Sequence, residues 1–342
     1  MERKIRFTLF SDLHYKKRMY ASTVADLEAI IGRAHISGSE LILHAGDFCN
    51  DYKGSKEIVD TFLGNRFGLP AYGIYGNHEL ETPGNTMEFV TPRLSNRPVV
   101  YGTPDGSFSP EIGYYHFDMN GFRFACIDTN YSYFEEKWTH NLPASWGPPN
   151  GAGRTNALGP DQVRWLEKTL IDAERNDLLC VLVSHADFTA TLPQTPSYDW
   201  TSVREIIKKV NSKKKTVVLA INGHYHTDHL HEIDGVFYLD CNTVRNGFWY
   251  PMAEQHYLPG QTFDFQDYDE NGNPTKLEKT DLRSLSQAKN TWFFDSPQSA
   301  VITLSESSLD IEGSSADWMY DVIPESLPDG KRPGITSHHI TF

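Results

Sequence analysis

Side chains suited to metal binding follow five apolar segments of the chain. Four of these segments lead directly into short clusters of carboxylate, amide and imidazole groups, and a fifth leads into a single histidine. Carboxylate and imidazole ligands without thiolates suit manganese, iron or zinc better than a structural zinc site built from cysteines. Two such ions about 4 Å apart can clamp a phosphoryl group and generate hydroxide at neutral pH. The clusters are Asp12-Leu13-His14, Gly46-Asp47-Phe48-Cys49-Asn50, Gly76-Asn77-His78-Glu79, Ser184-His185 and Gly223-His224-Tyr225-His226.

The spacing inside two clusters supports shared ligation of one ion. The first and third positions of an extended segment point the same way, so Asp12 and His14 are expected to reach one metal together. The same argument applies to His224 and His226. Three clusters also contain a glycine, which lets the backbone turn sharply and leaves room near the ions. These glycines are Gly46, Gly76 and Gly223.

Alternating strand and helix signals predict the scaffold behind the clusters. Strands are expected at 5–10, 41–45, 71–75, 178–183 and 216–221, and helices at 21–36, 55–63, 201–210 and from Pro160 onward. The dipeptides Asn120-Gly121 and Asp234-Gly235 predict two hairpins. This order indicates an α/β fold, in which ligands collect beyond the carboxyl ends of the strands.

The chain is expected to consist of a core at 1–250 and an extension at 251–342 that packs on the core. Residues 130–158, rich in glycine, proline, asparagine and aromatic residues, are expected to form a long insert loop. The aromatic residues of the insert could line a substrate pocket, or they could form the insert's own small core. They are Tyr131, Tyr133, Phe134, Trp138 and Trp146.

Other polar residues have plainer explanations. Asp267, Asp269, Asn271 and Glu278 fit the spacing of a calcium-binding loop, but the strand-like flanks favour a hairpin around Asn271-Gly272. Lysines at 208, 209 and 213–215 are expected to form a solvated helix end. Three further histidines are treated as ordinary, although the last two could touch substrate: His44, His229 and His231.

The composition limits the partners and the location. Of the 342 residues, 39% are apolar and 22% charged, which fits a globular protein with a sizeable core. A net charge of −14 argues against non-specific binding of duplex nucleic acid. The four scattered cysteines suit a reducing compartment, and no segment approaches the length of a membrane span. We therefore expect a cytoplasmic protein without a membrane partner, whose oligomeric state the sequence leaves open.

The five clusters resemble the motifs of the calcineurin-like metallophosphoesterases. The family pattern reads D-x-H, G-D-x-x-(D/N), G-N-H-(D/E), a lone H and G-H-x-H, and all five motifs occur here in order. Five chance matches in that order are improbable. The resemblance implies an αββα sandwich of two mixed sheets flanked by helices, with 1–250 as the catalytic core. It also implies two divalent metal ions, with manganese, iron and zinc as the candidates.

The resemblance further implies a role for each residue of the clusters. A hydroxide bridging the two ions would attack phosphorus in line with the leaving group, and Asp47 would bridge the same ions. His78 would stabilise charge on the phosphate or protonate the leaving oxygen, so His78 and Asp47 are the expected catalytic residues. Asn50 and Glu79 would orient the ligands. The first ion would also take Asp12, His14 and His226, and the second ion Asn77, His185 and His224.

A second set of residues resembles one branch of the family, the cyclic-nucleotide phosphodiesterase-like branch. The residues that carry this likeness are Ile127-Asp128-Thr129, Gly159-Pro160, Gln162 and Trp165-Leu166. We therefore expect hydrolysis of a phosphodiester, with a small phosphate ester such as a nucleotide as substrate. Phosphomonoester hydrolysis and a non-catalytic metal-binding scaffold are the two alternatives.

Overall fold

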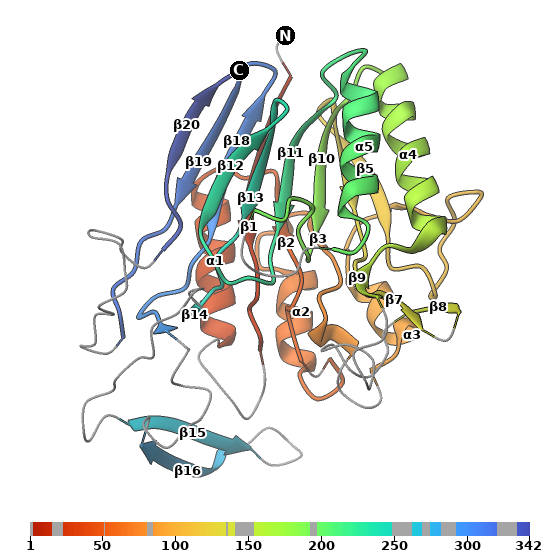
Figure 1. Ribbon diagram of the computed structural model, residues 1–342. Coiled ribbons are helices and arrows are strands. Elements are labelled where there is room, and N and C mark those ends of the chain that lie inside the picture. Colours follow the sequence, from red (N-terminus) through yellow and green to blue (C-terminus); the bar gives the residue numbers. More distant parts are fainter. Residues whose placement is uncertain are drawn as a thin grey trace.

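Two mixed β-sheets form the centre of the protein (Figure 1). The first sheet has the strand order β20-β19-β18-β1-β2-β3, and the second has the order β12-β13-β11-β10-β6-β5-β4. The predicted arrangement of two mixed sheets with flanking helices is confirmed. The computed structural model describes residues 3–15, 23–50, 52–80, 85–134, 136–140, 154–191, 197–247, 262–268, 274–281, 292–319 and 334–342.

The first sheet combines strands from both ends of the chain. β1 (Lys4–Phe10) is parallel to β2 (Leu41–His44), which is parallel to β3 (Ala71–Gly73). On its other side β1 pairs antiparallel with β18 (Ala300–Ser305), which continues to β19 (Ser308–Gly313) and β20 (His338–Thr341). These C-terminal strands are built into the core sheet, whereas the sequence predicted an extension packed on the core. β18 lies between β19 and β1 in this sheet and is buried along its whole length.

The second sheet has a parallel centre and antiparallel edges. Its strands are β4 (Val100–Tyr101), β5 (Tyr115–Met119), β6 (Phe122–Cys126), β10 (Leu179–Ser184), β11 (Val217–Asn222), β12 (His229–Ile233) and β13 (Val236–Asp240). β6, β10, β11 and β13 run parallel to one another. The two predicted hairpins are β5–β6 and β12–β13. Both residues of each turn have positive φ, as a type I′ hairpin turn requires.

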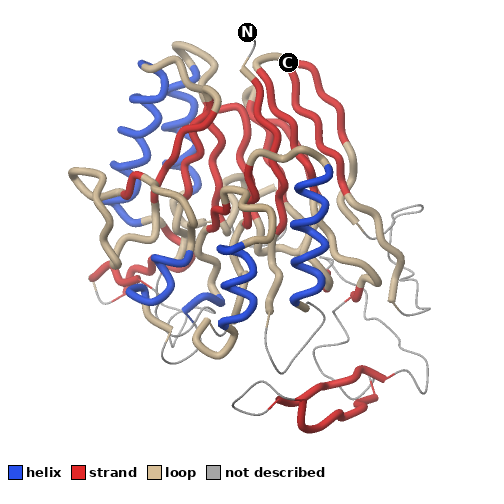
Figure 2. Tube along the Cα trace, turned by 180° about the vertical axis from the view of Figure 1, so that it is seen from behind, coloured by secondary structure: helices blue, strands red, loops and turns tan. Residues whose placement is uncertain are grey.

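Helices cover the outer face of each sheet (Figures 1 and 2). α1 (Val24–Ile36) packs on β1 and β2 beside α2 (Lys56–Gly64), and α4 (Gly159–Arg175) and α5 (Trp200–Asn211) lie side by side on the second sheet. α1 begins at a capping box in which Thr23 and Asp26 satisfy each other's backbone N–H groups. The remaining short helices are η1 (His78–Leu80), α3 (Met87–Val90) and η2 (Thr91–Arg93).

The core has two parts because β10 is buried on both faces. The side chains at 179, 181 and 183 pack in the cluster shared with the first sheet, and Cys180 and Leu182 pack under α4 and α5. Between the sheets, Phe7 of β1 meets Phe124 of β6 edge to face with ring centroids 5.4 Å apart. This packing on both sides holds the carboxyl ends of the central strands in place.

The insert contains regular structure where the sequence predicted a loop. β7 (Tyr131–Phe134), β8 (Lys137–His140) and β9 (Arg154–Ala157) form a small sheet of order β8-β7-β9. The prediction was wrong for these residues because strands of four residues are too short to show a period. Ring contacts join Tyr131 to His140 and Tyr133 to Trp138 within the insert. The side chain of Phe134 and all of Trp146 lie outside the described residues.

Two further strand pairs follow residue 245. β14 (Asn246–Gly247) pairs with β17 (Trp292–Phe293), and β15 (Thr262–Tyr268) pairs with β16 (Pro274–Asp281). The second pair is the hairpin predicted in place of a calcium loop, although its turn, with Asn271, lies outside the described residues. Figures 1 and 2 both draw this hairpin apart from the two large sheets.

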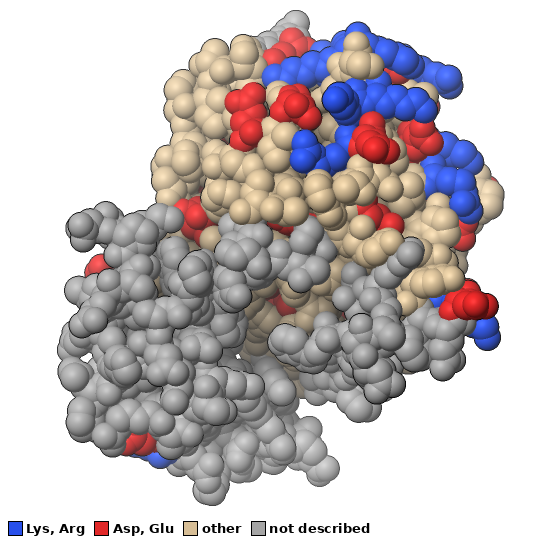
Figure 3. All heavy atoms as spheres, in the orientation of Figure 1, with Lys and Arg blue, Asp and Glu red and all other residues tan. Residues whose placement is uncertain are grey.

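The surface shown in Figure 3 carries both signs of charge, with Lys and Arg gathered over the ends of α4 and α5. Lys209 and Lys213 are exposed and lie 2.6 and 3.5 Å from Glu167 and Glu174 of α4. The predicted solvated helix end is therefore confirmed. Among the described residues, no helix combines the length and the apolar character that crossing a membrane would require.

Candidate metal centre

The predicted clusters meet where the carboxyl ends of the parallel strands of both sheets come together. In the first sheet, Asp12 follows β1 and Asp47 follows β2, while His224 follows β11 of the second sheet. The backbone N–H of His224 donates to the Asp12 carboxylate, with distances of 3.1 and 3.2 Å to its two oxygens. This contact between the sheets makes the separate clusters one site.

Asp12, His14 and His226 form the first group of ligand atoms, which all lie within 4.8 Å of one another. The Nε2 atoms of His14 and His226 are 3.0 Å apart. Oδ1 of Asp12 lies 3.2 Å from Nε2 of His226 and 3.7 Å from Nε2 of His14. Two imidazole nitrogens and a carboxylate oxygen that converge in this way can hold a divalent transition metal.

Asp47, His185 and His224 form the second group, and Asp47 reaches both groups. Its Oδ2 lies 3.2 Å from Nε2 of His185 and 3.7 Å from Nε2 of His14 in the first group. The side chains of Asp47 and His185 are almost completely buried. A carboxylate in this position can serve two ions at once.

Asn77 brings a buried oxygen that the protein leaves unsatisfied. Its Oδ1 has no hydrogen-bond partner among the described residues. The next residue, His78, donates its backbone N–H to Oδ1 of Asp47 at 2.9 Å, which ties the end of this loop to the second group. A buried acceptor without a partner costs about 1–3 kcal/mol, a cost that a bound cation would remove. The donor set and this oxygen therefore fit divalent metal ions.

The backbone is left-handed at five of the seven predicted ligands. φ is 52° at Asp12, 49° at His14, 50° at Asp47, 71° at His224 and 50° at His226. The expectation that the Asp-x-His and His-x-His pairs lie in extended segments was wrong, because both members of each pair adopt left-handed turns beyond the strand end. Such φ values are uncommon outside glycine, cost about 1–3 kcal/mol each and cluster at functional sites.

Two glycines leave room for the carboxylates. A Cβ atom at Gly76 would lie 2.1 Å from Oδ1 of Asp47, and one at Gly223 would lie 2.7 Å from Oδ2 of Asp12. Both distances are far below any normal contact, so a larger residue would displace the carboxylate. The expectation that these glycines leave room near the ligands is thus confirmed.

Burial and charge prepare the site for cations. Burial lowers the pKa of His14 to about 4 and that of His224 to about 3, so both imidazoles are neutral at pH 7. Burial would raise the pKa of Asp12, but His226 and His185 outweigh it and bring the pKa to about 2. His185 behaves differently: burial opposes its charge, yet Asp47 and Asp12 raise its pKa to about 10. In the metal-free protein, protonated His185 supplies positive charge beside the two carboxylates.

His78 stands at the edge of the ligand groups and is one-quarter exposed. Nδ2 of Asn50 donates to Nδ1 of His78 at 2.9 Å, which places the proton of a neutral imidazole on Nε2. That Nε2 atom lies 3.8 Å from Oδ2 of Asp47. Asn50 therefore orients His78, and Nε2–H of His78 faces the region where the ligand groups meet.

Glu79 lies beneath the site and is completely buried. Its carboxylate accepts hydrogen bonds from the backbone N–H groups of Asp47 at 3.0 Å, Phe48 at 2.7 Å and Gly76 at 2.5 Å. Burial and the charge of Asp47 raise the pKa of Glu79 to about 7. The loops after β2 and β3 are therefore joined through one side chain.

Two groups that the sequence did not suggest also touch the ligands. The hydroxyl of Ser11 donates to Oδ2 of Asp12 at 2.5 Å, and Nδ1 of His185 donates to the carbonyl oxygen of Ala45 at 2.8 Å. The second contact turns Nε2 of His185 toward Asp47. Ser11 precedes Asp12 in the sequence, so its contact with the Asp12 carboxylate could have been suggested. The contact of His185 with Ala45 uses a backbone carbonyl, which every residue has, so the sequence could not indicate it.

Hydrogen bonds hold several of the residues that suggested one branch of the family. The side chain of Gln162 accepts from the backbone N–H of Asp128 at 2.8 Å and donates to its carbonyl oxygen at 2.7 Å. The hydroxyl of Thr129 accepts from the backbone N–H of Ala186, next to His185, at 3.2 Å. These contacts join α4 to the segment after β6, and that segment to the residue after His185 beyond β10.

Comparison with known proteins defines the class. A family model described as calcineurin-like phosphoesterase matches residues 5–228. The chain belongs to this family and is a metal-dependent phosphoesterase. No curated protein sequence gives a significant match. The comparisons do not distinguish the cyclic-nucleotide phosphodiesterase-like branch, which stays a prediction.

Solved structures share the fold at low sequence identity. A dimetal phosphatase from Danio rerio is 15% identical with a TM-score of 0.57, and the match covers 90% of this chain and 95% of that one. GAP50, the anchor in the inner membrane complex of Plasmodium, is 13% identical with a TM-score of 0.51, and the match covers 99% and 89% of the two chains. An enzyme and an anchor thus share this architecture, so the fold alone does not decide activity.

Proposed function

We propose that this enzyme hydrolyses small phosphodiesters with the help of two divalent metal ions. The observation that carries the proposal is the pair of ligand groups linked by Asp47, each with imidazole nitrogens and carboxylate oxygens a few ångströms apart. The metals we propose are manganese, iron or zinc, since all seven ligand residues offer nitrogen or oxygen. The ligands would be Asp12, His14, Asp47, Asn77, His185, His224 and His226.

The chain's own groups have separate tasks in the proposed reaction. When bound, the two ions would polarise the phosphoryl oxygens and make water nucleophilic at neutral pH. His78 would donate the proton of its Nε2 to the leaving oxygen or hydrogen-bond to a phosphate oxygen, and Asn50 would hold that tautomer through Nδ1. Glu79 would keep Asp47 in place by accepting its backbone N–H.

The substrate we propose is a small phosphate ester such as a nucleotide, met in the cytoplasm. All four cysteines are free and buried, which suits a reducing compartment. The preference for diesters rests on the motif resemblance around Asp128 and Gln162. A phosphomonoester is the alternative substrate. The complete set of ligand types and the oriented His78 argue against a scaffold without turnover.

The test uses purified protein with Mn²⁺ on bis-p-nitrophenyl phosphate and p-nitrophenyl phosphate. We expect faster hydrolysis of the diester, and a preference for the monoester would overturn the diester assignment. Turnover of neither compound nor of native nucleotides, with two metals bound per chain, would instead support the scaffold.

A second arm tests the role of His78. His78→Ala should lower kcat about a hundred- to ten-thousand-fold while the metal content stays that of wild type, because general acid catalysis contributes on that scale. The matched control is His339→Ala, which removes an exposed histidine of β20. Unchanged turnover in His78→Ala would refute the role assigned to this residue.

A further inference from the structure

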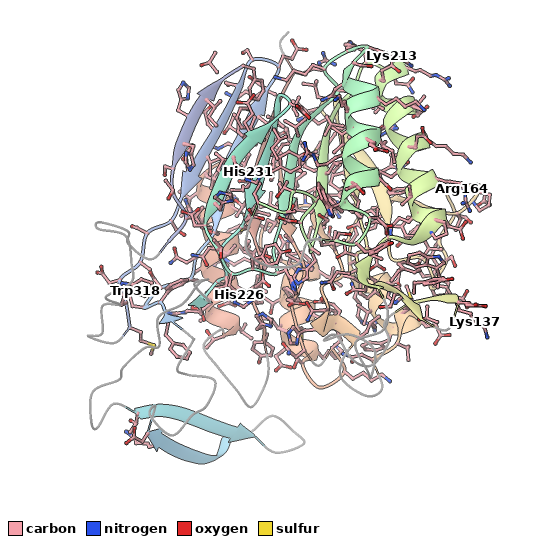
Figure 4. All side chains as sticks on the ribbon, viewed as in Figure 1. Lys137, Arg164, Lys213, His226, His231 and Trp318 are labelled. Carbon is pink, nitrogen blue, oxygen red and sulfur yellow. The ribbon has the colours of Figure 1, made fainter. Side chains whose placement is uncertain are left out.

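A third group of metal-binding side chains lies on the second sheet, outside the seven proposed ligands. His229, His231 and Asp240 place their ligand atoms within 4.8 Å of one another. Nδ1 of His229 lies 3.1 Å from Oδ2 of Asp240. The rings of His229 and His231 stack with centroids 4.6 Å apart. Figure 4 labels His231 on β12 and His226 of the first group at a different level of the molecule.

The hairpin register explains why these three side chains converge. His229 and His231 are two residues apart on β12, so their side chains leave the same face of the strand. Asp240 is the direct partner of His229 on β13. Directly opposed residues of an antiparallel pair have Cβ atoms about 5 Å apart. Two histidines on one strand and a carboxylate across from them therefore form a compact set of three ligands.

A ring nitrogen of His231 is also available to a cation. Nδ1 of His231 is buried and has no hydrogen-bond partner among the described residues, while Nε2 of the same ring lies 3.3 Å from the hydroxyl of Thr191. Burial, together with His229, lowers the pKa of His231 to about 4, so this imidazole is neutral at pH 7 and offers a lone pair. Contact of one ring nitrogen with Thr191 leaves the other for a metal.

A buried carboxylate contributes negative charge to the group. Asp240 is 1% exposed, and its pKa is raised by burial and further by the charge of Asp187, which is itself buried. In the part of the chain that the structure describes, His229 is the basic side chain within ion-pair distance of Asp240. Two neighbouring buried carboxylates are costly unless they are paired with positive charge or a metal.

We propose that His229, His231 and Asp240 form a third metal site that binds one divalent transition-metal ion of the zinc class. Two imidazoles and one carboxylate are a donor set that zinc accepts, and three protein ligands leave a fourth position for water or another solute. The side chain of His229 is 34% exposed, which gives the ion a route from solvent. This site shares no residue with the proposed dinuclear centre.

The competing explanation is a structural hydrogen-bond network. Asp240 also accepts from Nδ2 of Asn222 at 3.0 Å, and with His229 this pair could serve only to satisfy the buried carboxylate. That network gives no role to the buried Nδ1 of His231. The two explanations therefore differ in what replacing His231 does to the number of bound metals.

The test counts metals in the full-length protein. Wild type, His231→Gln and the control His339→Gln would be stripped with a chelator, refilled with Co²⁺ alone and analysed for bound metal and for the visible absorption of cobalt. Wild type and His339→Gln should hold one more Co²⁺ per chain than His231→Gln, with a matching loss of absorption. Equal counts in wild type and His231→Gln would overturn the site.

A second measurement covers the case in which His231→Gln does not fold. Crystals of wild type soaked in Co²⁺ should show an anomalous peak between His229, His231 and Asp240, and a map without this peak would overturn the proposal. Asp47→Asn separates the inference from the proposed function. The third site predicts that this variant keeps the metal that His231→Gln loses, whatever happens at the dinuclear centre.

Discussion

Replacing Glu79 by glutamine tests how the loops after β2 and β3 are held. The carboxylate accepts three backbone hydrogen bonds, from Asp47, Phe48 and Gly76. At pH 5 Glu79 is protonated, and both of its oxygens can still accept hydrogen bonds. The NH2 group of glutamine cannot accept, so at least one of these buried N–H groups loses its partner. Leaving a buried donor unsatisfied costs about 1–3 kcal/mol. At pH 5 we therefore expect Glu79→Gln to lower the free energy of unfolding of the metal-free protein by about this amount.

The effect of the same substitution should change with pH. Burial and Asp47 raise the pKa of Glu79 from 4.5 to about 7 in the folded, metal-free protein. The folded state then binds this proton more tightly than the unfolded state, so the stabilisation is present below pH 4.5 and is lost as the pH rises through 7. A pKa rise of this size corresponds to about 3 kcal/mol. Glutamine does not ionise, so the variant does not lose this stabilisation as the pH rises. At pH 8 its free energy of unfolding should therefore equal or exceed that of wild type.

The assay is urea unfolding of both proteins in the presence of a chelator at pH 5 and pH 8. Groups that titrate alike in the two proteins cancel in the difference between them. A stability difference that stays constant over this range would refute the reasoning. As a control, saturating Mn²⁺ should reduce the pH dependence, because cations near Asp47 favour the ionised form of Glu79.

Three further perturbations address the same site. Gly76→Ala should lower the metal content and destabilise the protein, because the new Cβ would lie 2.1 Å from Oδ1 of Asp47. Elemental analysis measures the first effect and thermal unfolding the second. Metal affinity should rise about tenfold per pH unit between pH 7 and 9, since protonated His185 must release one proton when the metal binds. Titration calorimetry in two buffers of different ionisation enthalpy detects this proton release. Asn50→Ala should lower kcat without changing metal content, because His78 loses the partner of its Nδ1, and steady-state kinetics with metal analysis checks this.

The sequence predicted most of the scaffold because its strands are strongly apolar and its turns are distinctive. β1, β2, β10 and β11 were placed within a residue or two, and both hairpins followed from Asn120-Gly121 and Asp234-Gly235. The place of β18 in the first sheet was not predicted. Pairing between Ile5 and Leu304 joins residues about 300 positions apart, and no local pattern encodes such a partner.

The composition of the candidate site was also accessible from the sequence, but its geometry was not. Residue types and motif order led to the prediction of Asp12, His14 and the other candidate ligands, which the structure gathers into neighbouring groups. The left-handed backbone at these residues was not foreseen. The group of His229, His231 and Asp240 shows the same limit. A His-x-His pair on a strand is visible in the sequence, but the carboxylate that completes the group lies across a hairpin and is identified only by the register.

Without metal, the site lowers the stability of the folded state, and metal binding should therefore raise it. Asp12 and Asp47 are 0% and 2% exposed, and each sits on a strained left-handed backbone. The proton on His185 offsets part of their negative charge. Divalent cations would replace that proton and add charge where both carboxylates converge, so metal binding should stabilise the folded state more strongly than the unfolded one. The buried negative charge that weakens the metal-free fold is thus the feature that we expect to favour cation binding.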